Sequence, residues 1–501
     1  MKWVAGSKET EREWLATLLS DAVAQHQAGR LDEAKDLYLQ ILAIDVRHAP
    51  SLFGLGAIAQ QSGNAQVAEK MIRRAIAIDG DNVQYHFALG GALQAQREFA
   101  EALSSFRHVL ELNPEMLPAR FRVGNVLQLE GKLDESIAEY ESILAIKPDS
   151  SEAEFNIGNV LRLQGKLPEA RVQYQKALKL QPDSVDAKWN LSLLNLLEGD
   201  YAAGWPLYES RQQRPTPNLR SFPMPQWKGE PLNGMPILLH AEQGLGDTLQ
   251  FLRFVPMVVA AGGQVLLDVP EQIVRLAAEI PGVEEAIATG EPIPDHAWQC
   301  PLMSLPLAFR MTLDSIPSQV PYLTVPADAL QSAAERPWPD NGLRVGLVWG
   351  ATARSFEDSD RSIPLALFES ILSTRDIRFF SLQLGSQAAQ LEALESPMTD
   401  LSSAIADFAD TAALVYHLDL VITVDTSVAH VAGAMGKPTW VLLPFSSDWR
   451  WLTHRDDSPW YPTVRLFRQA RPRDWPSVLE RVQLELELLA QNPGVRTRAS
   501  S

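Results

Sequence analysis

The sequence predicts an all-α repeat solenoid followed by two α/β lobes, and two observations carry this prediction. Glycine recurs every 34 residues in the N-terminal part, at Gly56, Gly90, Gly124 and Gly158. A fixed period of this length is typical of two-helix units that stack to bury one continuous core. Further along, short aliphatic runs alternate with helical segments, as in doubly wound parallel sheets.

Each repeat also carries a small residue and, four positions later, a bulky one. The small residues are Ala34, Ala68, Ala102, Ser136, Ala170 and Gly204, and the bulky ones are Tyr38, Ile72, Phe106, Tyr140, Tyr174 and Tyr208. Small residues let two helices approach closely, bulky ones fill the gap, and Pro114, Pro148 and Pro182 end three of the units. We expect about six such units over residues 13–212.

Asparagines in the later repeats offer a second, functional interpretation. Asn125, Asn156, Asn159 and Asn190 recur among the last three units. Asparagines at matching positions of successive repeats would form a ladder of amide groups. Because an amide both donates and accepts hydrogen bonds, this ladder could hold the backbone of an extended peptide or protein partner. The alternative is that asparagine is simply tolerated on exposed helix faces, and the sequence leaves both interpretations open.

Composition describes an ordinary globular protein and excludes some partners. The chain is 46% hydrophobic and 21% charged, with a formal net charge of -18, so phosphate-rich nucleic acid is not an expected partner. Cys300 is the one cysteine, which excludes an internal disulfide and suits a buried, inert thiol. With no signal-like apolar start and no long apolar run, we expect a cytoplasmic protein without a membrane span.

Proline-rich breaks divide the rest of the chain. Five prolines in and just after residues 213–230 forbid a regular helix, so this segment reads as a linker. Aliphatic runs such as "MPILLH", "GGQVLLDV", "RVGLVWG", "IRFFSLQLG", "LDLVITV" and "KPTWVLLP" follow as buried parallel strands. A second break at 335–342 separates an N-terminal lobe, 231–335, from a C-terminal lobe, 343–490, with a tail at 491–501. Two such lobes facing a cleft form a natural ligand site.

The segment "LLHAEQGLGDTLQF" places a carboxylate, Asp247, where a strand passes into a helix. Gly244 and Gly246 let the backbone approach a ligand, so both are candidate donor-binding residues. A dinucleotide fingerprint with Asp268 as the ribose acid is one alternative, but Leu249 replaces its third glycine. The other interpretations of Asp247 are a helix cap and a general base at the lip of a cleft.

A similar strand-to-helix unit, "LDLVITVDTSVAHVAGAMGKPTWVLLP", lies in the C-terminal lobe. Asp425, Thr426 and Ser427 open its helix, and His430 can share their face. Exposed N–H groups and hydroxyls at a helix start suit an anion or the hydroxyls of a sugar. The alternative is an ordinary cap at Asp425 and a packed histidine.

Arginines supply the positive charge that a donor diphosphate would need. Arg354 and Arg361 follow the strand "VGLVWG", and the guanidinium fork binds phosphate bidentately. The alternative is a mixed-charge surface loop, because acidic residues are interleaved. Arg450, between Trp449 and Trp451, is a weaker donor-binding candidate, since the tryptophans could either stack on a base or pack in the core.

These motifs together resemble known families. "GLGD", "RSIP" and "VDTSVAH…AMGKP" occur in the order seen in heptosyltransferase-like glycosyltransferases of the GT-B fold. The repeats resemble the tetratricopeptide repeat and the front end of protein O-GlcNAc transferases. The combination is similar to bacterial tetratricopeptide–glycosyltransferase fusions, with the GT-B resemblance over about 231–490 and the repeat resemblance over about 13–212.

The resemblance implies roles for individual residues. Asp247 matches the general base, Arg361 the basic residue on the donor phosphates (often lysine in heptosyltransferases), and Asp425, Thr426, Ser427 and His430 the donor-binding loop and helix. It implies an inverting, metal-independent glycosyltransferase that takes a nucleotide sugar and needs no cofactor. The acceptor hydroxyl is on a protein or on a glycan, and the repeats favour a protein, because a solenoid groove suits an extended chain. The sequence contains no cluster of His and Cys residues at the spacing of metal ligands, which agrees with a metal-independent reaction. The alternative is a tetratricopeptide scaffold whose GT-B domain is inactive.

Overall fold

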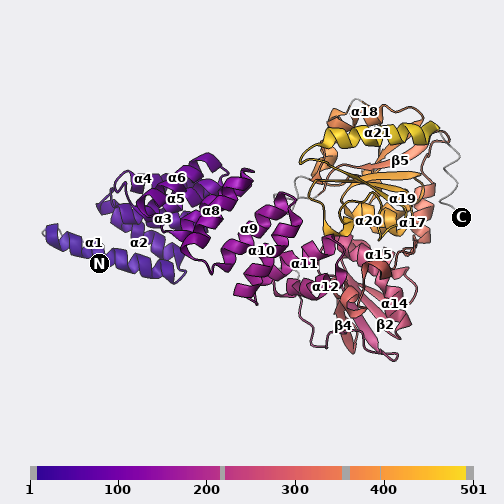
Figure 1. Ribbon diagram of the computed structural model, residues 1–501, viewed down its shortest axis with the longest axis horizontal. Coiled ribbons are helices and arrows are strands. Elements are labelled where there is room, and N and C mark those ends of the chain that lie inside the picture. The colour runs from indigo at the N-terminus through magenta and orange to yellow at the C-terminus, as the bar shows by residue number, and fades with distance from the viewer. Residues whose placement is uncertain (1–7, 215–219, 352–360, 395, 492–501) are drawn as a thin grey trace. The chain divides into compact units, whose positions relative to one another are not determined.

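The computed structural model describes residues 8–214, 220–351, 361–394 and 396–491. It divides the chain into two compact units, residues 1–187 and 188–501. The first unit is helical, and the second contains two parallel sheets with helices around them (Figure 1). The predicted fold class is therefore confirmed. Within the described ranges, no helix combines the length and the apolarity that crossing a bilayer requires.

Consecutive helices of the first unit pack against each other in pairs. They are α1 (Lys8–Gln27), α2 (Leu31–Ile44), α3 (Ala49–Gln61), α4 (Ala65–Ile76), α5 (Val83–Ala95), α6 (Phe99–Leu112), α7 (Leu117–Leu129), α8 (Leu133–Ile146), α9 (Ser151–Leu163) and α10 (Leu167–Leu180), with α11 (Val185–Leu197) next. A Cβ built on Gly90 would lie 2.6 Å from the Phe106 ring, and one on Gly124 2.6 Å from Tyr140. Because only glycine leaves room for these rings, helix contact explains the 34-residue recurrence of glycine.

The end of the repeat region is part of the second unit's core. Helix α12 (Tyr201–Tyr208) continues into the 3₁₀ helix η1 (Glu209–Gln213). The buried Trp205 ring lies 5.4 Å from Trp449 and 6.3 Å from Phe251, measured between ring centroids. The last helix of the repeats therefore packs into the α/β core instead of ending on its surface.

The front lobe is a four-stranded parallel sheet in the order β3-β2-β1-β4. Its strands and helices are β1 (Pro236–His240), α13 (Leu245–Phe251), η2 (Leu252–Phe254), α14 (Val255–Ala260), β2 (Gln264–Val269), α15 (Glu271–Ala278), β3 (Val283–Ala288), β4 (Trp298–Pro301), η3 (Leu302–Ser304), α16 (Leu305–Ala308) and η4 (Leu313–Ser315). Pro256 lies in the first turn of α14, so the helix that follows Asp247 stops at Phe251 and restarts after a 3₁₀ turn.

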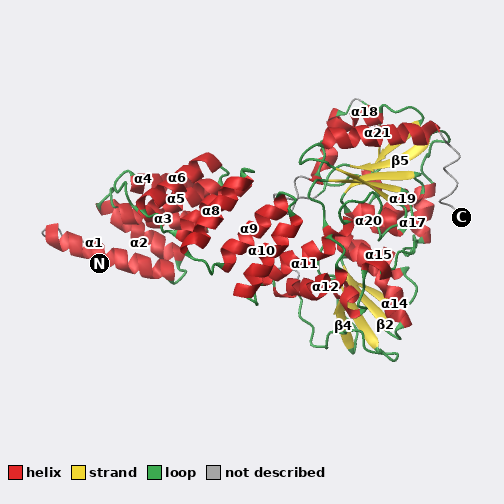
Figure 2. Cartoon of the chain, viewed as in Figure 1, coloured by secondary structure: helices red, strands yellow, loops and turns green. Residues whose placement is uncertain are grey.

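The rear lobe is a six-stranded parallel sheet in the order β10-β9-β8-β5-β6-β7. Its elements are β5 (Leu343–Val348), η6 (Leu365–Phe368), α18 (Glu369–Leu372), β6 (Ile377–Ser381), η7 (Ser386–Ala393), β7 (Thr399–Asp400), η8 (Ser402–Ala404), α19 (Phe408–Tyr416), β8 (Leu420–Val424), α20 (Ser427–Ala434), β9 (Thr439–Leu443), η9 (Trp449–Trp451), β10 (Val464–Arg468) and α21 (Trp475–Gln491). Helices α18 and α21 cover one face, and α19 and α20 lie on the other (Figure 2).

The passage between the lobes differs from its sequence pattern. Helix α17 (Ala327–Ala334) precedes the proline-rich break at 335–342, yet it packs against α19 of the rear lobe. Its buried residues Ala329 and Ala333 belong to the rear lobe's hydrophobic core. Helix α17 thus packs with the rear lobe, although it precedes the proline-rich break at which the sequence pattern places the boundary between the lobes.

Candidate functional site

Asp247 begins the site as the third residue of α13, just after the glycine-rich loop. Its Oδ2 accepts a hydrogen bond from the Gly244 backbone N–H at 2.7 Å, which satisfies a donor at the helix start. Its Oδ1 forms an ion pair with Nη2 of Arg450. Since the side chain is 20% exposed, Asp247 both caps its helix and reaches a partially open surface.

Arg450 links the two lobes through its guanidinium. It comes from η9 of the rear lobe, donates from Nε to Gln250 Oε1 at 2.6 Å and pairs through Nη1 with Asp448 at 2.7 Å. Burial opposes its charge, but the carboxylates of Asp247 and Asp448 outweigh this and raise the pKa of Arg450. A cation of the rear lobe is thus held against an acid of the front lobe.

The donor-loop candidates lie at the start of α20, at the carboxyl end of β8. Thr426 is the N-cap residue, with Oγ1 3.0 Å from Oγ1 of Thr423, and both Thr426 and Ser427 are partly exposed. Their position gives the helix N-terminus hydroxyls and backbone N–H groups directed toward the edge of the sheet. This is chemistry that suits a phosphate or a sugar hydroxyl.

Asp425, just before that helix, is buried, and its carboxyl interacts electrostatically with several charged side chains. Burial and the nearby Asp448 raise the pKa of Asp425 to about 6, while Arg361 and Arg450 act in the opposite direction. Arg361 is half-buried and lies close enough to act on this carboxyl. We call Asp247, Arg361, Asp425, Asp448 and Arg450 the charge cluster.

His430 lies at the contact between the lobes instead of on an open surface. Its ring is buried, with Nδ1 2.9 Å from the Tyr461 hydroxyl, and it stacks on Trp451. A Cβ built on Gly246 would lie 2.8 Å from His430 Cδ2, so glycine at 246 lets α13 approach α20. Burial and neighbouring arginines lower the pKa of His430, which keeps the imidazole neutral.

The structure therefore brings most of the predicted residues together. Asp247 and Gly246 of the front lobe meet His430 and Arg450 of the rear lobe, beside Arg361 and the Asp425–Ser427 loop. Arg354 lies outside the described residues. Sequence reasoning did not identify Gln250 and Asp448, which hold Arg450, because neither stands in a recognisable motif.

The acid of the dinucleotide alternative is already occupied. The Asp268 carboxyl is buried, pairs with Arg220 and accepts a hydrogen bond from Thr289 Oγ1 at 2.8 Å. A ribose-binding acid must present its carboxylate to the ligand. The contacts of Asp268 argue against that alternative.

Two asparagines of the proposed ladder are held by neighbouring tyrosines. Asn125 Oδ1 accepts from the Tyr140 hydroxyl at 2.6 Å, and Asn159 Oδ1 accepts from Tyr174 at 3.0 Å. Each tyrosine is the bulky residue of its own repeat, so the packing that builds the solenoid also orients the amides. Asn190 belongs to the second unit.

Models of known families match segments in both parts of the chain. Tetratricopeptide repeat families match residues 53–115, 93–154 and 158–199. Glycosyltransferase family 9 (heptosyltransferase) matches residues 384–456. The latter range contains Asp425 and Arg450 but neither Asp247 nor Arg361. The chain thus carries tetratricopeptide repeats and a glycosyltransferase family 9 domain, which confirms the predicted resemblance.

Individual relatives cover only part of this architecture. Protein FlbA of Caulobacter vibrioides is 28% identical over 325 residues, which cover 58% of this chain and 52% of FlbA, so the chain spans about half that relative's length. Among solved structures, the tetratricopeptide protein YrrB is 25% identical (TM-score 0.32, 34% of this chain, 88% of that one). Pseudomonas aeruginosa PilF is 19% identical (TM-score 0.34, 40% and 90%).

Proposed function

We propose that this chain, which joins tetratricopeptide repeats to a glycosyltransferase family 9 domain, is an inverting glycosyltransferase that moves a sugar from a nucleotide-diphosphate donor to a hydroxyl acceptor. The observation that carries this proposal is the charge cluster, where an acid of the front lobe meets cations of the rear lobe. Such a transfer needs a base on one side of the anomeric carbon and positive charge on the other.

The proposed reaction assigns those tasks to residues of the cluster. The acceptor hydroxyl attacks the anomeric carbon, its proton passes to the Asp247 carboxylate, and the bond to the diphosphate breaks with its electron pair on the phosphate oxygen. Arg361, Arg450 and the start of α20 stabilise that negative charge without a metal. Attack opposite the leaving group inverts the configuration of the sugar.

The contact between Asp247 and Arg450 implies an order of events. A carboxylate bound to a guanidinium is a poor proton acceptor, because protonation would break a charge-assisted hydrogen bond. A donor diphosphate offers Arg450 a competing anion. We infer that donor binding draws Arg450 away from Asp247, so the base becomes available once the donor is in place.

The acceptor is proposed to be carried by a protein. Solenoids of stacked helix pairs present an extended surface that suits a peptide chain, and the tyrosine-held amides of Asn125 and Asn159 supply oriented polar groups on it. Alanine at both positions in the full-length chain should weaken capture on a peptide array. Unchanged capture by that variant would remove the asparagines from the proposal.

The central experiment compares two carboxylates that hold the same arginine. A thermal-shift panel of UDP-, GDP-, ADP-, TDP- and CMP-linked sugars first selects a donor, because a ligand of the native state raises stability. Turnover of that donor should fall about 10²–10⁴-fold in Asp247→Asn, the loss expected for a general base. Asp448→Asn removes the other partner of Arg450 and should lose less than about tenfold. Equal losses in both variants would reduce Asp247 to a structural role.

One observation favours a second candidate function, a protein-binding scaffold with an inactive glycosyltransferase domain. Both carboxylate oxygens of Asp247 are engaged, one by the Gly244 N–H and one by Arg450. A scaffold would bind a nucleotide without hydrolysing or transferring the sugar. Measurable turnover of any donor in the panel that depends on Asp247 excludes this candidate.

A further inference from the structure

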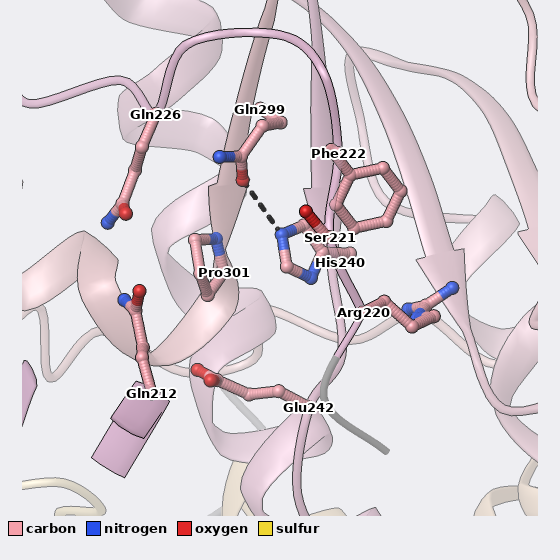
Figure 3. A pocket seen from close by; sticks show the side chains of 9 residues that line it. All are labelled: Gln212, Arg220, Ser221, Phe222, Gln226, His240, Glu242, Gln299 and Pro301. Carbon is pink, nitrogen blue, oxygen red and sulfur yellow. Dashed lines mark hydrogen bonds between the residues drawn. The ribbon is translucent and has the colours of Figure 1, made fainter. Parts of the chain in front are cut away.

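The front lobe contains a pocket of about 290 Å³ at the carboxyl ends of β1 and β4 (Figure 3). Three parts of the chain build it: Gln212 from η1, Phe222 and Gln226 from the segment before β1, and the strand residues His240 and Gln299. Volumes of about 300 Å³ mark the lower end of small-molecule sites. The pocket therefore has room for one small group.

The segment that closes the pocket is fixed by the sheet. The Trp227 N–H donates to the Gln299 carbonyl at 2.8 Å, and the Gln299 N–H donates to the Pro225 carbonyl at 3.1 Å. Gln226 thus lies beside β4 like an additional strand residue. Because these bonds are backbone bonds, the wall of the pocket is part of the fold.

The charged groups at the pocket are already neutralised inside the protein. Arg220 pairs with the buried Asp268 and donates to the Ala241 carbonyl at 3.1 Å. Glu242 accepts from Nε and Nη2 of Arg211 at 3.1 and 2.7 Å. A ligand charge would have to break one of these pairs, so the pocket disfavours a phosphate or an ammonium group.

The remaining polar groups are neutral. His240 Nε2 donates to Gln299 Oε1 at 2.9 Å, since an amide oxygen only accepts. Burial lowers the pKa of His240 to about 4, so the ring is neutral near pH 7 and its Nδ1 is an acceptor. Among the described residues nothing donates to that Nδ1. The Gln299 amide N–H groups complete a donor and acceptor pair.

An aromatic ring and further amides surround that pair. The Phe222 ring lies 4.5 Å from the His240 ring, centroid to centroid. Gln212 and Gln226 both donate to Glu209, at 2.8 and 3.3 Å, and their side chains point toward each other across the opening (Figure 3). Neutral amides, an imidazole and one aromatic face match a group with several hydroxyls on an apolar ring.

We propose that this pocket holds a neutral sugar residue already carried by the acceptor, which rests on the proposed glycosyltransferase function. The pocket and the proposed base are near each other, because Glu242 lies in the short loop between β1 and α13, Asp247 is the third residue of α13, and the two carboxylates interact electrostatically. In this proposal a hydroxyl of the seated sugar reaches Asp247, the proposed base. The enzyme would then extend a glycan and not start one.

The test measures binding of free sugars by ligand-observed NMR on the full-length protein. The neutral probes are glucose, galactose, mannose and N-acetylglucosamine, and the charged probes are glucose 6-phosphate, glucuronate and glucosamine. We expect at least one neutral probe to bind, with its charged counterparts at least tenfold weaker. Gln299→Leu and the near-isosteric Gln299→Glu should each weaken binding at least tenfold. The matched control is Gln264→Leu, because Gln264 is exposed at the start of β2. This variant should bind the neutral sugar as tightly as the parent protein does.

Three results would overturn the inference. They are no binding of any neutral probe at tens of millimolar, equal binding of the charged counterparts, and binding unaffected by both Gln299 variants. Donor binding is measured on the same samples with the nucleotide-sugar panel. If nucleotide sugars bind and neutral sugars do not, the pocket inference fails while the proposed function stands. If neither binds, both fail.

Discussion

Replacing Arg450 by methionine tests the contact between the lobes on which the proposed mechanism depends. The arginine side chain is 9% exposed, and methionine fills similar space without donors or charge. The change leaves the buried Gln250 side chain without the donor to its Oε1 and leaves Asp247 and Asp448 without their shared cation. All three partners lose their interaction at once.

The expected loss can be worked from these contacts. Removing one partner of a buried ion pair costs about 3–5 kcal/mol. Because Asp247 and Asp448 are 20% and 36% exposed, water screens part of this, and we expect the lower end, about 3 kcal/mol. For a large unit this corresponds to a melting temperature about 5–10 °C lower.

The assay is thermal unfolding of the full-length chain, followed by tryptophan fluorescence and circular dichroism. The matched control is Arg455→Met, because Arg455 pairs with Asp457 at 2.6 Å on a far more exposed surface. The control should lose no more than about 1 kcal/mol. Adding Asp247→Asn to Arg450→Met should recover part of the loss, since no unpaired carboxylate then remains at residue 247. Equal losses in Arg450→Met and Arg455→Met would refute the reasoning.

Two further predictions concern the same site. Gly246→Ala should destabilise the protein by about 1–3 kcal/mol in urea unfolding, because the new Cβ would meet the fixed His430 ring at 2.8 Å. Gly80→Ala is the control, because a Cβ at Gly80 would lie 3.8 Å from its nearest atom. An unchanged stability of Gly246→Ala would contradict the close contact between Gly246 and His430. Asp425 binds its proton more tightly when folded, so this carboxyl favours folding at low pH and that contribution is lost as pH rises from about 4 to about 6. Asp425→Asn should remove this pH dependence and stabilise the protein by up to about 3 kcal/mol at pH 7. If the stability of variant and parent depended on pH in the same way, the pKa of Asp425 would not be raised in the folded protein.

The repeat fold was predictable because its determinants are local. The glycine and the ring it accommodates lie 16 residues apart, as in Gly90 and Phe106, and the same pair recurs along the chain. The strands β1, β2, β5, β6, β8 and β9 were predicted because they are buried aliphatic runs. The sequence patterns did not predict β3, β4, β7 and β10. β3 lies at the sheet edge with Glu284 and Glu285 exposed, β4 and β7 have only four and two residues, and two arginines interrupt the aliphatic pattern of β10.

The sequence patterns predicted the site residues at the helix starts, but they did not predict which side chains of the two lobes contact each other. Strand-to-helix turns place Asp247 and Thr426 at the carboxyl edges of two sheets, which sequence patterns show directly. Arg450 lies 203 residues from Asp247, and no local pattern predicts that contact. His430 shares the helix with Thr426, yet close packing against Gly246 buries it, and burial depends on the other lobe.

The position of Trp205 in the α/β core has a consequence for how such chains can vary. Whole repeats ahead of residue 188 can be duplicated or deleted as modules, because each one makes its contacts with its neighbours. Helix α12 has no such freedom, since its loss would uncover Phe251 and Trp449. A truncation series should therefore tolerate removal of complete repeats from the front and fail abruptly once residues 201–208 are cut.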